Sequence, residues 1–112
     1  MPKGEFLGEF EQVVLLALAR LKDRAYGMAI REEIEDRTGR DVGIGSVYSA
    51  LDRMEKKGFV ASHVGDPTPE RGGRAKRFYA LEWPGFVALQ RTREMYASLW
   101  DGLQLDRDAY GP

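Results

Sequence analysis

Basic side chains crowd into one short segment of the chain, between positions 71 and 77. Four positive charges fall within these seven residues, and no acidic residue lies among them. The four residues are Arg71, Arg74, Lys76 and Arg77. Such cations bind DNA phosphates, and the adjacent pair Gly72-Gly73 would let the backbone approach a duplex closely. The segment is therefore a candidate nucleic-acid contact, with Arg74 suited to a narrow minor groove; a solvated loop is the alternative interpretation.

Small hydroxyl side chains form a second candidate surface, between residues 44 and 57. Apolar side chains recur there at helical spacing, at positions 44, 47, 48, 51 and 54. The opposite side presents Ser46, Ser49, Ala50, Arg53 and Lys57. Such a helix could enter a major groove, where Ser46, Ser49 and Arg53 would bond to bases or phosphates. The free N–H groups at its start could also face a phosphate.

Two tyrosines lie close to these candidate surfaces. Tyr48 falls on the apolar side of the helix by its spacing, so its ring is predicted to pack in the core. Its hydroxyl either packs there too or reaches a phosphate. Tyr26, directly before Gly27, is either an aromatic residue of the turn or a phosphate contact at the start of a helix. Both tyrosines are candidates for DNA contact.

The distribution of charge supports a binding surface in the middle of the chain. The 112 residues carry a net charge of −1, which by itself argues against a polyanionic partner. Residues 44–80, however, hold seven basic and four acidic side chains, and the rest of the chain is correspondingly acidic. Because the local field decides where an anion binds, this segment is the predicted binding surface.

The residue types exclude several other kinds of chemistry. The chain has no cysteine and one histidine, His63, so it lacks thiol nucleophiles and a histidine-based metal site. One imidazole without a partnered acid or nucleophile makes no catalytic site, so we predict no enzyme, no cofactor and no special role for His63. The longest apolar run, residues 13–19, is far shorter than the about 20 residues that span a bilayer. The N-terminus lacks the pattern of a secretory signal, so we expect a cytoplasmic protein without a membrane partner.

Hydrophobic spacing and glycine positions predict the elements that carry these residues. Helices are predicted over residues 6–21, 28–37 and 44–57, and Gly39 and Gly58 end the last two. On the first helix, apolar residues at 7, 10, 14, 18 and 21 share a face that residues 13, 15 and 16 widen. A hairpin follows, with strands over 59–64 and 76–81 around a long, basic, glycine-rich tip.

The order of these elements predicts a winged helix-turn-helix, a mainly α (α+β) fold with a two-stranded wing. A final helix is predicted over residues 85–103, and the tail from residue 104 to residue 112 is predicted to fray. We divide the chain into a DNA-binding domain at residues 6–82, a C-terminal dimerisation helix at 83–104 and a tail at 105–112.

The final helix carries an apolar stripe that so small a domain has little core left to cover. Phe86, Leu89, Arg93, Tyr96, Trp100 and Leu103 recur at heptad spacing, with Met95 and Leu99 beside them. A second copy would cover this stripe, and its symmetry would set two recognition helices about 34 Å apart. The predicted homodimer interface consists of Phe86, Leu89, Tyr96, Leu99, Trp100 and Leu103.

Four segments, in order, resemble the PadR-type transcriptional regulators. Residues 45–60, GSVYSALDRMEKKGFV, resemble the family's third-helix signature, which has a tyrosine, a leucine three residues on, and an acidic-basic-glycine-apolar exit. Residues 16–19 (LALA) and 26–27 (YG) match its first helix and the start of its second helix. Residues 73–81 (GRAKRFYAL) are similar to the returning strand of its wing. The resemblance covers residues 7–103.

The resemblance implies a member of the short subfamily with a single C-terminal dimerisation helix. It implies a dimeric repressor that binds a pseudo-palindromic operator in double-stranded DNA. It also makes a small aromatic effector a candidate partner, sandwiched between paired Trp100 rings beside Tyr96; packing between the two copies is the alternative role of these rings. The chain departs from the family pattern at residues 82–85, where EWPG replaces Leu-Thr-x-x-Gly, and in its longer hairpin tip.

The sequence therefore predicts a sequence-specific DNA-binding transcriptional regulator that acts as a homodimeric repressor and that a small aromatic ligand could release. The predicted DNA-binding residues are Tyr26, Ser46, Tyr48, Ser49, Arg53, Arg74, Lys76 and Arg77. The alternative is a winged-helix protein-interaction module that does not touch DNA, for which the net charge is the best argument. Of these two interpretations, only the DNA-binding regulator predicts that the protein is retained on DNA in a salt-sensitive way.

Overall fold

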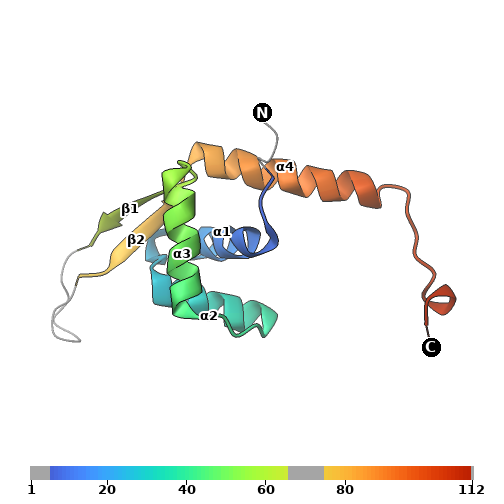
Figure 1. Ribbon diagram of the computed structural model, residues 1–112, viewed down its shortest axis with the longest axis horizontal. Coiled ribbons are helices and arrows are strands. Elements are labelled where there is room, and N and C mark those ends of the chain that lie inside the picture. The colour runs from blue at the N-terminus through green and yellow to red at the C-terminus, as the bar shows by residue number, and fades with distance from the viewer. Residues whose placement is uncertain (1–5, 66–74, 112) are drawn as a thin grey trace.

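The computed structural model describes residues 6–65 and 75–111 (Figure 1). Its elements are α1 (Glu9–Leu21), the 3-10 turn η1 (Lys22–Arg24), α2 (Gly27–Thr38), α3 (Ile44–Lys56), β1 (Val60–Val64), β2 (Arg77–Leu81), α4 (Trp83–Trp100) and the 3-10 turn η3 (Arg107–Ala109). This order confirms the predicted winged helix-turn-helix with its two-stranded wing. Within the described ranges, no helix is both long and apolar enough to cross a bilayer.

One hydrophobic core holds α1, α2 and α3 together. The large side chains that are buried most completely include Leu15, Leu18, Ile30, Ile34, Leu51 and Met54. On each helix they recur at intervals that place them on the inward side. Each such side chain stabilises the fold by roughly 1.5–3 kcal/mol on burial. The predicted inner positions of α3 at residues 47, 51 and 54 are thereby confirmed, and Ile30 and Ile34 form the buried side of α2.

Two residues lie on the opposite side from the one predicted. Ala50, assigned to the polar face of α3, is fully buried, because it lies three residues after Val47 and four before Met54 and so shares their face. Leu16, expected to widen the buried face of α1, is exposed, since its neighbours Leu15 and Ala17 are the ones that turn toward the core.

The first helix begins three residues later than predicted. The backbone of residues 6–8 is extended or bent, and the N–H of Leu7 donates a hydrogen bond of 3.1 Å to Oγ1 of Thr92 on α4. Gly8 is the N-cap, and its N–H donates to the side chain of Glu11 at 3.3 Å. Leu7 is therefore held against α4, and α1 begins only at Glu9.

Both predicted glycine stops are confirmed. Gly39 follows α2 with a φ of 72°, and Gly58 follows α3 with a φ of 79°. This left-handed backbone region suits glycine, which has no Cβ to clash. At the second stop the N–H of Phe59 donates to the carbonyl of Met54 at 2.9 Å, so the chain turns directly from α3 into β1.

The wing is an antiparallel hairpin attached to the helical core. Ser62 lies opposite Tyr79 in the register, and the two strands begin within one residue of their predicted positions. The N–H of Tyr79 donates to the carbonyl of Ala25 at 2.8 Å, which ties β2 to the segment before α2. The predicted contacts of Arg71 and Arg74 at the tip lie outside the described residues.

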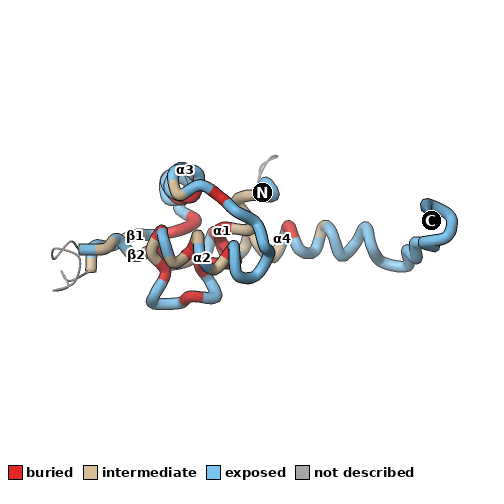
Figure 2. Tube along the Cα trace, turned by 90° about the horizontal axis from the view of Figure 1, so that it is seen from below, coloured by how far each residue is buried: buried red, intermediate tan, exposed pale blue. Residues whose placement is uncertain are grey.

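The last helix packs on the core through one side of its first half. It begins at Trp83 rather than Gly85, because Pro84 fits the first turn of a helix, and it ends at Trp100 rather than Leu103. Its buried residues are Gly85, Ala88 and Thr92. Figure 2 shows the second half of α4 exposed and extending away from the other helices.

The tail that follows is partly ordered rather than frayed. η3 forms over Arg107–Ala109, and the carboxylate of Asp106 caps it by accepting from the N–H of Asp108 at 3.0 Å. The prediction of fraying was therefore wrong for this turn, because an aspartate at the N-cap stabilises it locally.

Candidate nucleic-acid interface

The outer face of α3 presents small polar groups, as the sequence predicted. Ser46 and Ser49 are exposed on the side turned away from the core. The helix starts after Gly43 with no side-chain cap on its first N–H groups, and a Cβ added at Gly45 would meet nothing within 4 Å. An uncapped helix start beside so little side-chain bulk leaves backbone donors accessible to an anion.

The cations at the other end of α3 face a carboxylate on α1. Nε of Arg53 lies 3.9 Å from Oε2 of Glu11, and Nζ of Lys57 lies 3.6 Å from the same oxygen. The Glu11 side chain is only 14% exposed, whereas both cations are about half exposed. Glu11 of α1 therefore faces both cations, a contact between elements that the spacing along the sequence did not predict.

Tyr48 packs its ring across the start of α2. A Cβ on Gly27 would lie 2.4 Å from the ring and from the hydroxyl oxygen, so any other residue at this position would displace the tyrosine ring. The residue is nonetheless 44% exposed. The prediction that its ring lies in the core was wrong, because residue 48 falls at the edge of the buried face, and the ring instead covers Gly27.

Tyr26 is the centre of a small aromatic cluster between α2 and the wing. Its ring and that of Phe78 pack edge to face with the centroids 5.7 Å apart, and Nζ of Lys76 lies 4.3 Å from the Tyr26 centroid. A cation over an aromatic face is stabilised by roughly 0.5–1 kcal/mol at exposed sites. His63 stacks on the same Phe78, at 5.8 Å. The cluster places the ammonium of Lys76 next to the N-cap residue of α2.

Arg77 is connected to α3 through a serine. Its Nη1 donates a hydrogen bond of 3.0 Å to Oγ of Ser62 on β1, and that hydroxyl donates one of 2.6 Å to Oε2 of Glu55. Neither Ser62 nor Glu55 was among the predicted site residues. Their proximity depends on the register of the wing and on the turn at Gly58, which no local pattern reveals.

The phenol of Tyr79 lies close to this connection. Burial raises the pKa of Tyr79 above its usual value, because an ionised phenolate would lose solvation. The guanidinium of Arg77 acts in the opposite direction, while Glu55 raises the pKa further. Opposite charges from two elements therefore act on one ring at the junction of α3 and the wing.

The structure brings most of the predicted DNA-binding residues onto α3, the start of α2 and the base of the wing. The residues placed there are Tyr26, Ser46, Tyr48, Ser49, Arg53, Lys76 and Arg77. In Figure 1, α3 crosses in front of α1, and the wing leaves from its end. Arg74 is the one predicted residue outside the described ranges.

A second surface, apolar rather than charged, covers the outer half of α4 and the residues after it. Tyr96, Leu99, Trp100 and Leu103 are all exposed, Leu99 by 69%. Phe86 is exposed too and stacks on Trp83, with the ring centroids 5.3 Å apart. Leu89 differs from the other predicted interface residues, because it packs partly against the core of its own chain.

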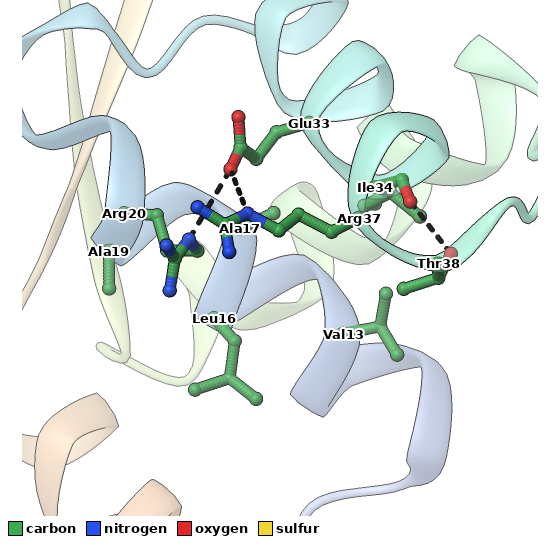
Figure 3. Close-up of a pocket in the computed structure, with 9 residues that line it drawn as sticks. All are labelled: Val13, Leu16, Ala17, Ala19, Arg20, Glu33, Ile34, Arg37 and Thr38. Carbon is green, nitrogen blue, oxygen red and sulfur yellow. Dashed lines mark hydrogen bonds and ion pairs between the residues drawn. The ribbon is translucent and has the colours of Figure 1, made fainter.

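A shallow apolar groove of about 440 Å³ lies between α1 and α2 (Figure 3). Leu16 and Val13 project into it from α1. At its edge, Oε2 of Glu33 lies 3.3 Å from Nε of Arg20 and 3.2 Å from Nε of Arg37. Neither Tyr96 nor Trp100, the predicted ligand residues, lines this groove.

Comparison with known families gives one match. The model of the transcriptional regulator PadR-like family matches residues 14–91, from the middle of α1 to the middle of α4. No curated protein sequence matches the chain.

Several solved structures share the fold. RosR of H. salinarum is 31% identical, with 88% of this chain and 81% of RosR covered and a TM-score of 0.66. A PadR family transcription regulator from Clostridium difficile R20291 is 25% identical, with 82% and 92% covered and a TM-score of 0.65. Another PadR family regulator, from Eggerthella lenta, is also 25% identical, with 84% and 81% covered and the same TM-score.

Proposed function

The chain belongs to the PadR-like family of transcriptional regulators, a family of regulators and not of enzymes, and we propose that it is a homodimeric repressor that binds a pseudo-palindromic DNA operator. One observation carries this proposal. Two cations lie near α3, whose outer face presents exposed hydroxyls: Arg77 is joined through Ser62 to Glu55 in its last turn, and Lys76 lies over Tyr26, next to the Gly27 that Tyr48 of α3 covers. A helix flanked by fixed cations suits a duplex, whose major groove admits a helix and whose edges are phosphates.

In this proposal α3 reads bases in the major groove. Ser46 and Ser49 donate or accept hydrogen bonds at base edges, and Arg53 bonds to a base or a phosphate from the next turns of the same face. The pairing of Arg53 with Glu11 spans 3.9 Å, a long ion pair with half of the arginine side chain exposed. The guanidinium can therefore exchange this partner for DNA, because an exposed ion pair contributes little.

Residues around α3 bind the DNA backbone. Lys76 and Tyr26, held together at the start of α2, contact one phosphate, and the Tyr48 hydroxyl and Arg77 contact its neighbours. Arg74 extends this set toward the minor groove. Since phosphate contacts carry no sequence information, these residues set affinity and register, and α3 sets the preference among operators.

The homodimer forms through the exposed half of α4. Tyr96, Leu99, Trp100 and Leu103, together with Phe86, bury their apolar surface against the second copy. Two-fold symmetry then presents both copies of α3 to successive major grooves, about 34 Å apart. Residues 6–82 form the DNA-binding domain in this arrangement, residues 83–104 the dimerisation helix and residues 105–112 a tail.

A small aromatic ligand is the proposed signal for release. Trp100 and Tyr96 are exposed on the dimerisation helix, at 58% and 47%, and two copies would present paired rings to a flat ligand. Offset stacking stabilises such a ligand beyond the area that it buries. Quenching of tryptophan fluorescence by planar aromatic compounds, lost in Trp100→Leu, supports this site; equal quenching in the variant contradicts it.

Selection of binding sites from a random duplex library tests the main proposal. We expect the purified full-length chain to enrich a two-fold related sequence with half-sites about 10 base pairs apart, and to bind it less tightly as salt rises. A protein-interaction module would enrich no sequence and would bind no duplex even at low salt. That outcome would overturn the proposal.

A further inference from the structure

Three elements meet at the base of the wing through two consecutive hydrogen bonds. Glu55 comes from the last turn of α3, Ser62 from the middle of β1, and Arg77 from the first position of β2. The serine hydroxyl has one hydrogen, which it gives to Glu55 at 2.6 Å, and it accepts from Arg77 at 3.0 Å. The hydroxyl thus acts as a donor toward one charged side chain and as an acceptor toward the other.

We propose that Ser62 is a positioning residue for DNA binding, which orders the Arg77 guanidinium beside α3 before DNA arrives by joining it to Glu55. The inference rests on the proposed function, because the ordered guanidinium matters only if it meets a phosphate. It differs from that function in assigning a role to two residues, Ser62 and Glu55, that contact no DNA themselves.

The register of the wing supports this assignment. Ser62 lies opposite Tyr79, and Arg77 lies two residues before Tyr79 on the same strand. Ser62 and Arg77 are therefore diagonal neighbours on one face of the hairpin, within reach of a long side chain. The influence of both Arg77 and Glu55 on the Tyr79 phenol agrees with this grouping.

The two hydrogen bonds that join Arg77, Ser62 and Glu55, here called the relay, leave the arginine available to a phosphate. An arginine has five N–H donors, and the described residues take one of them, through Ser62. Within the described ranges no carboxylate lies within ion-pair distance of Arg77, whereas Arg53 and Lys57 both face Glu11. A free arginine would lose rotamer freedom on binding, and one that is already ordered loses less, so the relay raises affinity by preorganisation.

The effect of substituting Glu55 distinguishes two roles of Ser62, positioning of Arg77 and direct contact with a phosphate. If Ser62 bonded to a phosphate itself, Glu55→Ala would tighten DNA binding whether or not Ser62 is present. The reason is that the substitution removes a negative charge that repels the DNA phosphates. If Ser62 acts through Glu55, Glu55→Ala tightens binding only in the Ser62→Ala background. In the presence of Ser62, the same change also breaks the relay and offsets that gain.

The experiment is a double-mutant cycle on operator binding by the full chain, measured over a series of salt concentrations. We expect Ser62→Ala to weaken binding about tenfold, or about 1.4 kcal/mol, with the salt slope unchanged because Arg77 keeps its charge. Arg77→Ala should instead reduce the slope by about one. Ser62→Thr, which retains the hydroxyl, should restore binding to within about twofold. The effect of Glu55→Ala should differ at least about threefold between the two backgrounds.

Two controls make the result decisive. Asp36→Ala truncates an exposed polar side chain near the end of α2, outside both α3 with the wing and the outer half of α4, and should change binding less than about twofold; circular dichroism checks that each variant is folded. In the DNA-free protein, exchange of the Arg77 guanidinium protons measured by NMR should accelerate in Ser62→Ala.

The outcomes are distinguishable. Binding within about twofold of the unchanged chain, additive effects in the cycle, or unaltered guanidinium exchange each overturn the positioning role while leaving the proposed function intact. If the unchanged chain binds no duplex at all, the proposed function and this role fall together.

Discussion

The outer face of α3 with the base of the wing, here called the α3–wing face, is polar and charged, whereas the outer half of α4 is apolar. The α3–wing face includes Ser46, Ser49, Lys76 and Arg77. On the first, charged and polar groups are held by specific contacts, as Lys76 is by Tyr26 and Arg77 by Ser62. On the second, Leu99 and Trp100 are apolar and more than half exposed. A polar surface that is already ordered suits a charged ligand in water, whereas an apolar one is stabilised by being covered.

The boundary between buried and exposed parts of α4 lies at Thr92. Up to that point the helix is fixed to the core: Oγ1 of Thr92 accepts from Leu7 and donates to the carbonyl of Ala88 at 2.8 Å. Beyond Thr92, the helix extends past the core, because a chain of this size forms only one hydrophobic core and α1 to α3 surround it. The two surfaces should therefore respond to different variables, the first to salt and the second to protein concentration.

Trp100→Glu should have the largest effect, because it changes both dimerisation and operator binding. A charge in the middle of the apolar surface opposes pairing of two copies, and loss of a central aromatic residue costs an interface about 2–4 kcal/mol. We expect a monomer by sedimentation and operator affinity lower by about 100-fold or more, since the two half-sites are no longer bound together. Tyr110→Glu, an equal change at an exposed tail residue, should have neither effect, and a variant Trp100→Glu that remains a dimer contradicts the account.

Gly85→Ala tests the joint between the two surfaces. The added Cβ would lie 2.3 Å from the carbonyl oxygen of Phe59, so α4 must move away from the wing's base. The free energy of unfolding should fall by about 1–3 kcal/mol in urea titrations. Gly45→Ala is the control, because its Cβ meets nothing and alanine favours a helix by up to about 1 kcal/mol. Equal stability of the two variants would mean that α4 does not pack as described.

Lys76→Ala tests whether the cation at the base of the wing contacts a DNA phosphate. Binding to operator and to random duplex should weaken by the same factor, about three- to tenfold, and the slope of log K against log salt should fall by about one. Fluorescence anisotropy at several salt concentrations measures both. Arg107→Ala removes the same charge from η3, far along the chain, and should leave the slope unchanged. A loss on operator DNA alone would argue against a phosphate contact.

Ser49→Ala separates base reading from phosphate binding within the first surface. Because one hydrogen bond to a base edge discriminates by about 1 kcal/mol, we expect a change of about fivefold in preference among operator variants. Affinity for random duplex should stay the same, and competition with single-base operator variants measures the difference. Equal losses on specific and random DNA would count against base reading.

The smallest expected effect concerns pH and Tyr79. Its pKa is raised in the folded chain, chiefly by burial, so the unfolded chain loses the phenolic proton first as pH increases. Stability from this group is complete below about pH 10 and falls as pH rises through the higher folded value. Thermal unfolding between pH 9 and 11, roughly the range where tyrosine titrates, should show this loss. In Tyr79→Phe the alkaline loss should shrink, and an unchanged pH profile would contradict the assignment.

Spacing along the sequence was sufficient to predict what depends on one element. The inner positions Ile30, Leu51 and Met54 follow from helical periodicity, and Gly39 and Gly58 mark stops that need a positive φ. The exposed stripe of α4 was also visible in the sequence, since it follows a heptad.

Contacts between elements could not be predicted in the same way. Glu11 meets Arg53 across 42 positions of the chain, and Ser62 meets Glu55 only because the turn after α3 places β1 beside that helix. Leu89 shows the same limit, since the pattern of α4 cannot distinguish a residue that packs on its own core from one that faces a second copy.

Sedimentation of the full chain with a fluorescent operator duplex at low ionic strength measures how many chains bind one duplex. We expect two chains to sediment with each duplex, and the same pair of chains to persist when DNA is absent. A single chain sedimenting apart from a duplex that moves alone would contradict it.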